Sequence, residues 1–168
     1  MNTNSIIIIL IIILLLYLTQ SKVEGYTNIN EVSFRRYDRF NPMYFAAPMK
    51  ECYLSTHYNG HITRGFGNEN WNSHRFTLVP LGSNLYAIKS VALGYYIYLD
   101  PSKGYDLSSN LPKTLSPYHV WYIKADKNGE TIIWNPKTKR FIALSCRDGN
   151  AYTRINYSND CIFNMMIP

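Results

Sequence analysis

The feature that most constrains this chain is an internal repeat of 45 residues. Three segments, YLSTHYNG, IYLDPSKG and IALSCRDG, each run from apolar residues through a leucine and a polar stretch to a glycine. Their leucines are Leu54, Leu99 and Leu144, which are 45 residues apart both times. A fixed period of this length is typical of units that cannot bury their apolar face alone and share one core. We therefore expect three copies of one structural unit.

Each unit also ends in a short aromatic segment. Phe76 lies in FTLVP, Trp121 in WYIKA and Phe163 in FNMMIP, at spacings of 45 and 42 residues. These closing segments keep nearly the same phase as the leucines, which makes an accidental repeat a poor explanation. The two series together predict that every unit contributes equivalent apolar positions to the core.

The segments between these marks are short apolar or aromatic runs, and Gly, Asn, Pro and Ser separate them. No long amphipathic helix is visible. A threefold repeat of short strands predicts an all-β chain of the β-trefoil class, with four strands per unit, a short barrel and a hairpin cap. A β-sandwich is the alternative. Strands are expected at 52–57, 74–79, 84–89, 95–99, 120–125, 130–134, 141–145 and 161–167.

The N-terminus carries thirteen consecutive apolar residues at 6–18. A bilayer span needs roughly 20 residues, whereas the apolar part of a secretory signal has about 7–15. Small residues at Val23 and Gly25 suit a cleavage site. We predict a signal peptide at 1–25, an N-terminal extension at 26–43 and the trefoil domain at 44–168, and hence a secreted, extracellular protein. Because no Lys or Arg precedes the apolar run, an uncleaved anchor is the alternative.

Export places the three cysteines, Cys52, Cys146 and Cys161, in an oxidising compartment. An odd count leaves one thiol over. Cys146 and Cys161 are the disulfide candidate, since they bracket a short loop, but spacing alone leaves the other pairings open. One glycosylation sequon, Asn156-Tyr157-Ser158, lies inside the same loop.

The net charge of +6 is spread along the chain rather than gathered in one stripe. For an exported protein this favours an acidic polysaccharide over nucleic acid as a partner. No G-x-S-x-G, H-E-x-x-H or phosphate-binding glycine loop is present, so no enzyme, metal site or cofactor is predicted. After signal cleavage no membrane contact is expected.

The middle of the chain resembles the fibroblast growth factors. The resemblance is carried by LYAIKS at 85–90, GYYIYLD at 94–100, DKNG at 126–129, RFIAL at 140–144 and the apolar ending IFNMMIP at 162–168. It covers residue 53 to the C-terminus and implies the β-trefoil fold. The vocabulary, rich in Asn, Tyr, Ile and Lys, resembles members of that family from insect viruses of the baculovirus type.

The resemblance implies an extracellular ligand of a receptor tyrosine kinase ectodomain, with heparan sulfate as co-receptor and no chemistry of its own. The positions that match receptor contacts in the family are Asp126, Asn128 and Met166. The chain departs from the family at 130–133, where ETII replaces a Tyr-Asn-Thr-Tyr stretch. This departure affects the expected choice of receptor.

The heparin-binding loop departs further. In the family a loop dense in Lys and Arg follows the third glycine, whereas 147–160 holds two arginines opposed by two aspartates. Glycan binding is therefore expected to be weak or relocated. Arg35, Arg36 and Arg39 form one further basic cluster near the N-terminus. The residues assigned to glycan contact are Arg147, Arg154, Lys137, Lys139 and Arg140.

Two other functions suit a trefoil. A carbohydrate-binding, lectin-like module is the first, although the Gln-x-Trp that closes each unit of ricin-type modules is absent from this chain. A protease inhibitor acting through an exposed loop near 109–116 is the second. Binding to uncharged sugars or to proteases would separate these functions from receptor binding.

Overall fold

The computed structural model describes residues 31–37, 51–66, 71–125, 130–146 and 150–167. The signal peptide expected at 1–25 lies outside these residues. Across the ranges that are described, no helix has both the length and the apolar character needed to cross a membrane.

The described chain forms twelve strands in three units of four. A short 3-10 turn precedes the last strand of every unit, and one more follows β6. The first unit holds β1 (Val32–Tyr37), β2 (Glu51–Thr56), β3 (Ile62–Gly65), η2 (Asn72–His74) and β4 (Arg75–Gly82). The second holds β5 (Leu85–Ser90), β6 (Tyr96–Asp100), η3 (Pro101–Lys103), β7 (Asp106–Asn110), η4 (Pro117–His119) and β8 (Trp121–Ala125). The third holds β9 (Glu130–Asn135), β10 (Arg140–Leu144), β11 (Ala151–Arg154), η5 (Asn159–Cys161) and β12 (Phe163–Met166).

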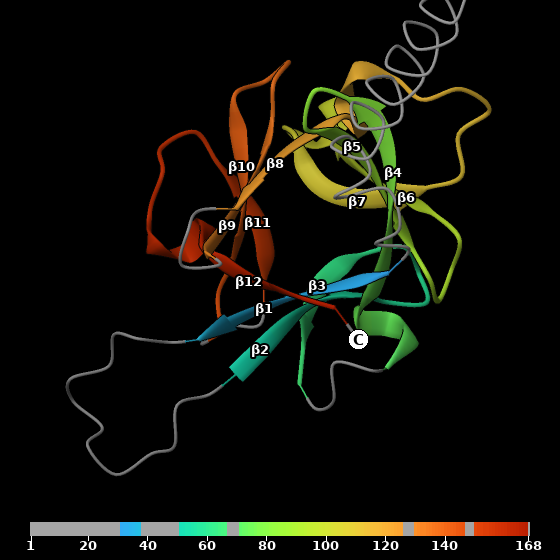
Figure 1. The fold of residues 1–168 in the computed structure, drawn as a ribbon. Helices are drawn as coiled ribbons and strands as arrows, with labels where there is room; N and C mark the ends of the chain where they lie inside the picture. Colours follow the sequence, from blue (N-terminus) through green and yellow to red (C-terminus); the bar gives the residue numbers. More distant parts are fainter. Residues whose placement is uncertain (1–30, 38–50, 67–70, 126–129, 147–149, 168) are drawn as a thin grey trace, which may run out of the picture.

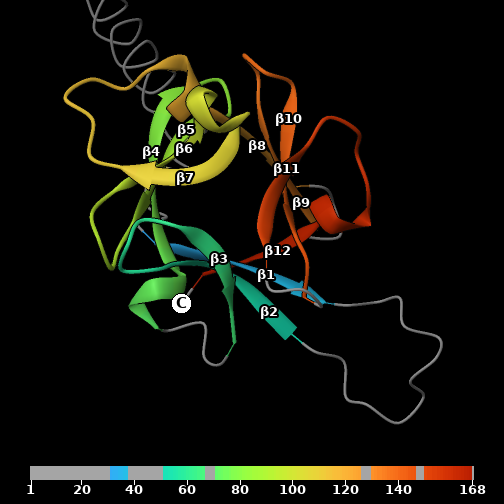
Figure 2. The same ribbon diagram turned by 180° about the vertical axis from the view of Figure 1, so that it is seen from behind.

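Strand pairing repeats in every unit. The first strand pairs with the fourth, as β1–β4, β5–β8 and β9–β12. The fourth strand pairs with the first strand of the next unit, as β4–β5, β8–β9 and β12–β1, which closes a barrel (Figure 1). The second and third strands form the hairpins β2–β3, β6–β7 and β10–β11. Figure 2 shows β3, β7 and β11, one from each hairpin, grouped around the centre of the molecule.

The repeat positions form the core. Leu54, Leu99 and Leu144 are fully buried, and so are Phe76 and Trp121, with Phe163 1% exposed. Their burial confirms that the 45-residue period is the period of the fold.

Phe34 of β1 joins the aromatic layer of the core. Its ring centroid lies 6.0 Å from that of Phe76 and 6.2 Å from that of Phe163. These contacts link the first unit to the third, because Phe34 and Phe76 belong to one and Phe163 to the other. The core is therefore continuous across the point where the barrel closes.

A buried polar side chain at the end of each first strand links neighbouring units. Ser90 of β5 bonds to the hydroxyl of Thr56 at 2.7 Å, and Asn135 of β9 donates to the carbonyl of Val120 at 2.9 Å. The equivalent residue of β1 is Arg36, which donates to the carbonyl of Leu144. Since buried polar groups need partners, these bonds fix how each unit meets the one before it.

The extension expected at 26–43 is wrong in its boundary. Residues 32–37 form β1, which pairs with β2, β4 and β12. Val32 and Phe34 are fully buried in the common core. The domain must therefore begin before residue 44, because the barrel cannot close without β1.

The predicted pairing of Cys146 with Cys161 is also wrong. The disulfide joins Cys52 to Cys146, with Cα atoms 5.5 Å apart, and Cys161 is a buried free cysteine. Cys52 lies on β2 of the first unit and Cys146 follows β10 of the third, so the bond ties the two units at the closure of the barrel. Cys161 ends η5 and holds the position of His74 and His119 in the other units.

Replacing Gly65 by alanine is expected to cost about 3 kcal/mol of unfolding free energy, because a Cβ there would overlap the imidazole of His74. That imidazole cannot move aside, since it is buried and stacks on Tyr53 at 5.0 Å and on Trp71 at 5.5 Å. The control is Gly104→Ala, which has open space and should cost roughly 1 kcal/mol for its left-handed φ of 67°. Urea denaturation measures both, and an equal cost would contradict the clash.

Candidate functional site

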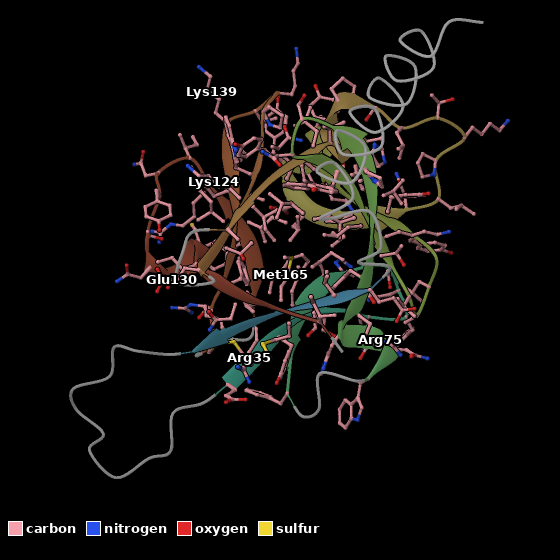
Figure 3. All side chains as sticks on the ribbon, in the orientation of Figure 1. Arg35, Arg75, Lys124, Glu130, Lys139 and Met165 are labelled. Atoms are coloured by element: carbon pink, nitrogen blue, oxygen red, sulfur yellow. A yellow bond between two sulfur atoms is a disulfide. The ribbon has the colours of Figure 1, made fainter. Side chains whose placement is uncertain are left out.

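The candidate receptor contact Met166 lies on the outer face of β12. Its neighbour Met165 packs against the core, so the alternation of the strand turns Met166 outward, where it is partly exposed. Asp126 and Asn128 lie outside the described residues. The strand that follows them, β9, begins at Glu130, which pairs with Asn164 of β12. Met166 is two residues further along that strand, and Figure 3 shows Glu130 and Met165 on these neighbouring strands.

Four of the five candidate glycan residues lie at one end of the β10–β11 hairpin. Lys137 and Lys139 are exposed in the β9–β10 turn, and Arg140 begins β10. Arg154 ends β11 and lies at the same end of the hairpin, because it pairs with Phe141 of β10. Figure 3 shows Lys139 at the outer tip of this turn. We call these four residues, Lys137, Lys139, Arg140 and Arg154, the basic end.

The fifth candidate, Arg147, lies outside the described residues, in the segment that joins β10 to β11. That segment starts at the other end of the hairpin, where Leu144 pairs with Ala151. With about 3.4 Å per residue, the length of β10 puts some 14 Å between that point and Arg140. The Leu144 end of the hairpin is therefore well separated from the basic end.

The N-terminal arginine cluster offers little free charge. Arg36 is buried and bonded to Asp160 at 2.6 Å. Arg35 lies 3.6 Å from the carboxylate of Glu51. Arg39 lies outside the described residues. In the described part of this cluster, both guanidinium groups are thus matched by a carboxylate.

Asp160 organises the residues around Arg154. Its carboxylate accepts from Arg36 at 2.6 Å and from the hydroxyl of Tyr152 at 2.8 Å, and Arg154 lies 3.3 Å away. Arg154 also donates to Ser158 at 2.8 Å. Within the described residues, neither Lys137 nor Lys139 forms an ion pair. The freest positive charge of the basic end is therefore at its tip.

The contact between Tyr152 and Asp160 makes the stability of the fold decrease at high pH. Burial, followed by the hydrogen bond to Asp160 and the charge of that carboxylate, raises the pKa of Tyr152 to about 12 from 10.0. The folded state holds the phenol proton more tightly than the unfolded state, so this contribution to stability is complete below pH 10 and is lost between pH 10 and 12. Thermal melts should show a shallower decline over that range for Tyr152→Phe than for the wild type. Equal slopes would contradict the account.

A row of aromatic side chains runs from β8, the last strand of the second unit, across β9 and β10 of the third unit. Tyr122 of β8 pairs with Trp134 of β9, and Trp134 pairs with Phe141 of β10. The ring centroids are 5.8 Å and 6.2 Å apart. Tyr157, 54% exposed, adds a fourth ring at 5.8 Å from Phe141. We call Tyr122, Trp134, Phe141 and Tyr157 the aromatic row.

Sequence reasoning missed the aromatic row, because its members come from four separate segments. The available signal was the alternation within each strand. Tyr122, Trp134 and Phe141 each flank a buried core residue and so had to face outward. Only the strand register brings them together.

Comparison with known proteins supports the fold. The chain resembles the crystal structure of a designed threefold-symmetric protein, ThreeFoil, with a TM-score of 0.63 and 11% sequence identity, over 80% of this chain and 96% of that one. No protein-family model matches the sequence. No curated protein matches it either. With its twelve strands and threefold pairing, the chain has a β-trefoil fold, as the repeat predicted.

Proposed function

We propose that this protein is an extracellular growth factor of the fibroblast growth factor type, which binds the ectodomain of a receptor tyrosine kinase. Asp126, Asn128 and Met166 are the proposed contact residues. Signalling follows from bringing two receptors together and needs no catalytic group on the ligand. Heparan sulfate is the proposed co-receptor.

The observation that carries this proposal is the agreement between the family resemblance and the strand order. LYAIKS coincides with β5, the YIYLD part of GYYIYLD with β6, and RFIAL with β10. The apolar ending contains β12, which carries Met166. Short resembling segments support a family more strongly when they occupy the same strands, in the same order, of the same fold.

Heparan sulfate contact is assigned to the basic end. Lys137 and Lys139 are exposed at its tip, whereas Arg154 already has Asp160 beside it. Arg140 lies over the ring of Tyr105 at 5.3 Å and donates to Thr153. Two free lysines bind a sulfated chain weakly, since individual surface ion pairs contribute about 0–1 kcal/mol.

Binding of the mature chain to immobilised receptor ectodomains tests the proposal. Met166→Glu should weaken binding at least tenfold, because a charge would have to be buried in the interface, which corresponds to about 1.4 kcal/mol. The control is Leu111→Glu, at an exposed apolar residue after β7 in another unit, which should bind like the wild type. Addition of heparin should tighten wild-type binding but not that of Lys137→Ser with Lys139→Ser. Absence of binding to every such receptor would refute the function.

Carbohydrate binding is the second candidate, and one observation favours it. Trp71 is 56% exposed, and its ring is held by stacking on His74, which is itself buried. A fixed, exposed indole is a suitable surface for the apolar face of a sugar ring. A glycan array of uncharged sugars, probed with wild type and Trp71→Ala, tests it. Binding lost in that variant would favour this function.

A further inference from the structure

Asn156 is the one asparagine of this sequence that is followed by a non-proline residue and then by serine or threonine. The structure puts it in the short loop between β11 and η5, with its side chain exposed. Sequons that are used in secreted proteins lie on such surface loops. The position is therefore open to modification.

The two neighbours of Asn156 are exposed apolar residues. Ile155 is 64% exposed and Tyr157 is 54% exposed. Tyr157 sets its ring edge against Phe141 at an interplanar angle of 66°, so it is supported rather than loose. Exposed apolar surface that is gathered in one place usually has a binding role. Here it surrounds the amide that the sequon marks.

Beyond Tyr157 the aromatic surface continues along the aromatic row. Phe141 and Trp134 are partly exposed, and their rings lie within 26° of parallel. A sugar ring presents C–H groups on one face, and these are attracted to the negative face of an aromatic ring. The surface next to Asn156 thus suits the sugars that would be attached there.

We propose that Asn156 carries an N-linked glycan whose first sugars pack on Tyr157 and Phe141. The inference rests on the export that the proposed function also requires. In the reaction, the side-chain nitrogen of Asn156 bonds to C1 of the first sugar of a lipid-pyrophosphate-linked oligosaccharide. The C1–O bond breaks, the lipid pyrophosphate leaves with the electron pair, and the amide loses one proton.

The packed glycan also bears on the basic end. Arg154 is two residues before Asn156, and Phe141 pairs with Arg154 across the hairpin. Sugars on Phe141 and Tyr157 would lie beside Arg154 and leave Lys137 and Lys139, at the turn, as the accessible cations. The modification would therefore narrow the surface that is open to an acidic polysaccharide.

The test expresses the full chain in a eukaryotic secretory host and measures its intact mass and melting temperature. The wild type should carry one glycan, and Asn156→Gln none. Trimming to the first sugar should preserve the melting temperature. Complete absence of the glycan should lower the melting temperature by about 2–4 °C. The glycan is absent in Asn156→Gln and in Asn156→Asp, and the second variant has the same sequence as the product of an amide-cleaving glycosidase.

Tyr157→Ala keeps the sequon and tests the packing. In this variant the trimmed and glycan-free forms should melt at the same temperature, whereas the control Tyr58→Ala, at an 83% exposed tyrosine in the β2–β3 turn, should keep the difference. The sequon is not removed by replacing Ser158, because the Ser158 hydroxyl accepts a hydrogen bond from Arg154 at 2.8 Å, which would be lost as well.

An exported chain without a glycan would overturn this inference alone. A glycan whose effect on melting is unchanged in Tyr157→Ala would overturn the packing. A chain retained inside the cell would remove the premise that both this inference and the receptor proposal share.

Discussion

Replacing Cys52 and Cys146 together by alanine is expected to lower the free energy of unfolding by roughly 4–5 kcal/mol. The two residues are 94 positions apart, so their bond restricts a long loop of the unfolded chain. They also join the first unit to the third, where the barrel closes. No other pair of units within the described residues is linked by a disulfide. We expect this variant to be among the least stable of those considered.

Guanidinium denaturation measures this loss of unfolding free energy, with the proteins handled so that the free thiol of Cys161 is not oxidised. The matched control is Cys161→Ala, which removes a buried sulfur but leaves the disulfide intact, at a cost on the order of 1 kcal/mol. Peptide mapping without reduction should recover residues 52 and 146 in one linked fragment. A fragment linking Cys146 to Cys161, or equal stability of the two variants, would contradict the structure.

Replacing Trp121 by alanine should cost about 3–5 kcal/mol, the range for removing a large aromatic side chain from a packed core. Trp121 is fully buried, and it fills the same place in its unit as Phe76 and Phe163 fill in theirs. Its indole nitrogen also donates to the carbonyl of Ile97 at 3.0 Å. The variant therefore loses packing at a position that all three units share.

Trp121→Phe separates packing from hydrogen bonding. Phenylalanine is the residue at both equivalent positions, so the aromatic layer is largely preserved, but the carbonyl of Ile97 loses its side-chain partner. A cost of about 1–3 kcal/mol is expected. Urea denaturation of both variants gives the comparison. If Trp121→Phe were as damaging as Trp121→Ala, the equivalence of the three positions would be in doubt.

Much of the fold could be predicted from the sequence, because the core repeats. The predicted strands include all six that carry a Leu, Trp or Phe of the periodic series, together with β5 and β9. The strands missed were β1, β3, β7 and β11, of which β7 reads Asp-Leu-Ser-Ser-Asn. Of these, β3, β7 and β11 belong to the hairpins and gain their order from pairing with a neighbour, whereas β1 is a barrel strand that contributes Val32 and Phe34 to the core. Pattern within a short polar segment is too weak to reveal this.

The disulfide shows where local reasoning fails. Cys146 and Cys161 are close in sequence, but closeness in sequence says little about contact in a barrel. Cys52 occupies the position that Ile97 and Ile142 hold in the other units, all of them fully buried. Cys146 comes just beyond Leu144, between β10 and β11 of the third unit, and is also buried in the core. Their meeting depends on the closure between units, which follows from the topology and not from spacing.

The candidate surfaces were predictable in residue type but not in arrangement. The sequence showed cations near 137–140 and at Arg154, and the pairing of β10 with β11 brings them to one end. It could not show that Asp160 would accept from both Arg36 and Tyr152. Ion pairs between distant segments depend on three-dimensional placement, which charge counts along the chain do not contain.

The most direct test of the proposed function is receptor phosphorylation in cells that display a receptor kinase of the fibroblast growth factor type. The mature, disulfide-bonded chain is added with heparin, and phosphotyrosine on the receptor is measured against dose. The account predicts phosphorylation that rises with dose, and a weaker response to Met166→Glu than to Leu111→Glu. A chain that melts cooperatively, yet leaves every such receptor unphosphorylated and unbound, would contradict it.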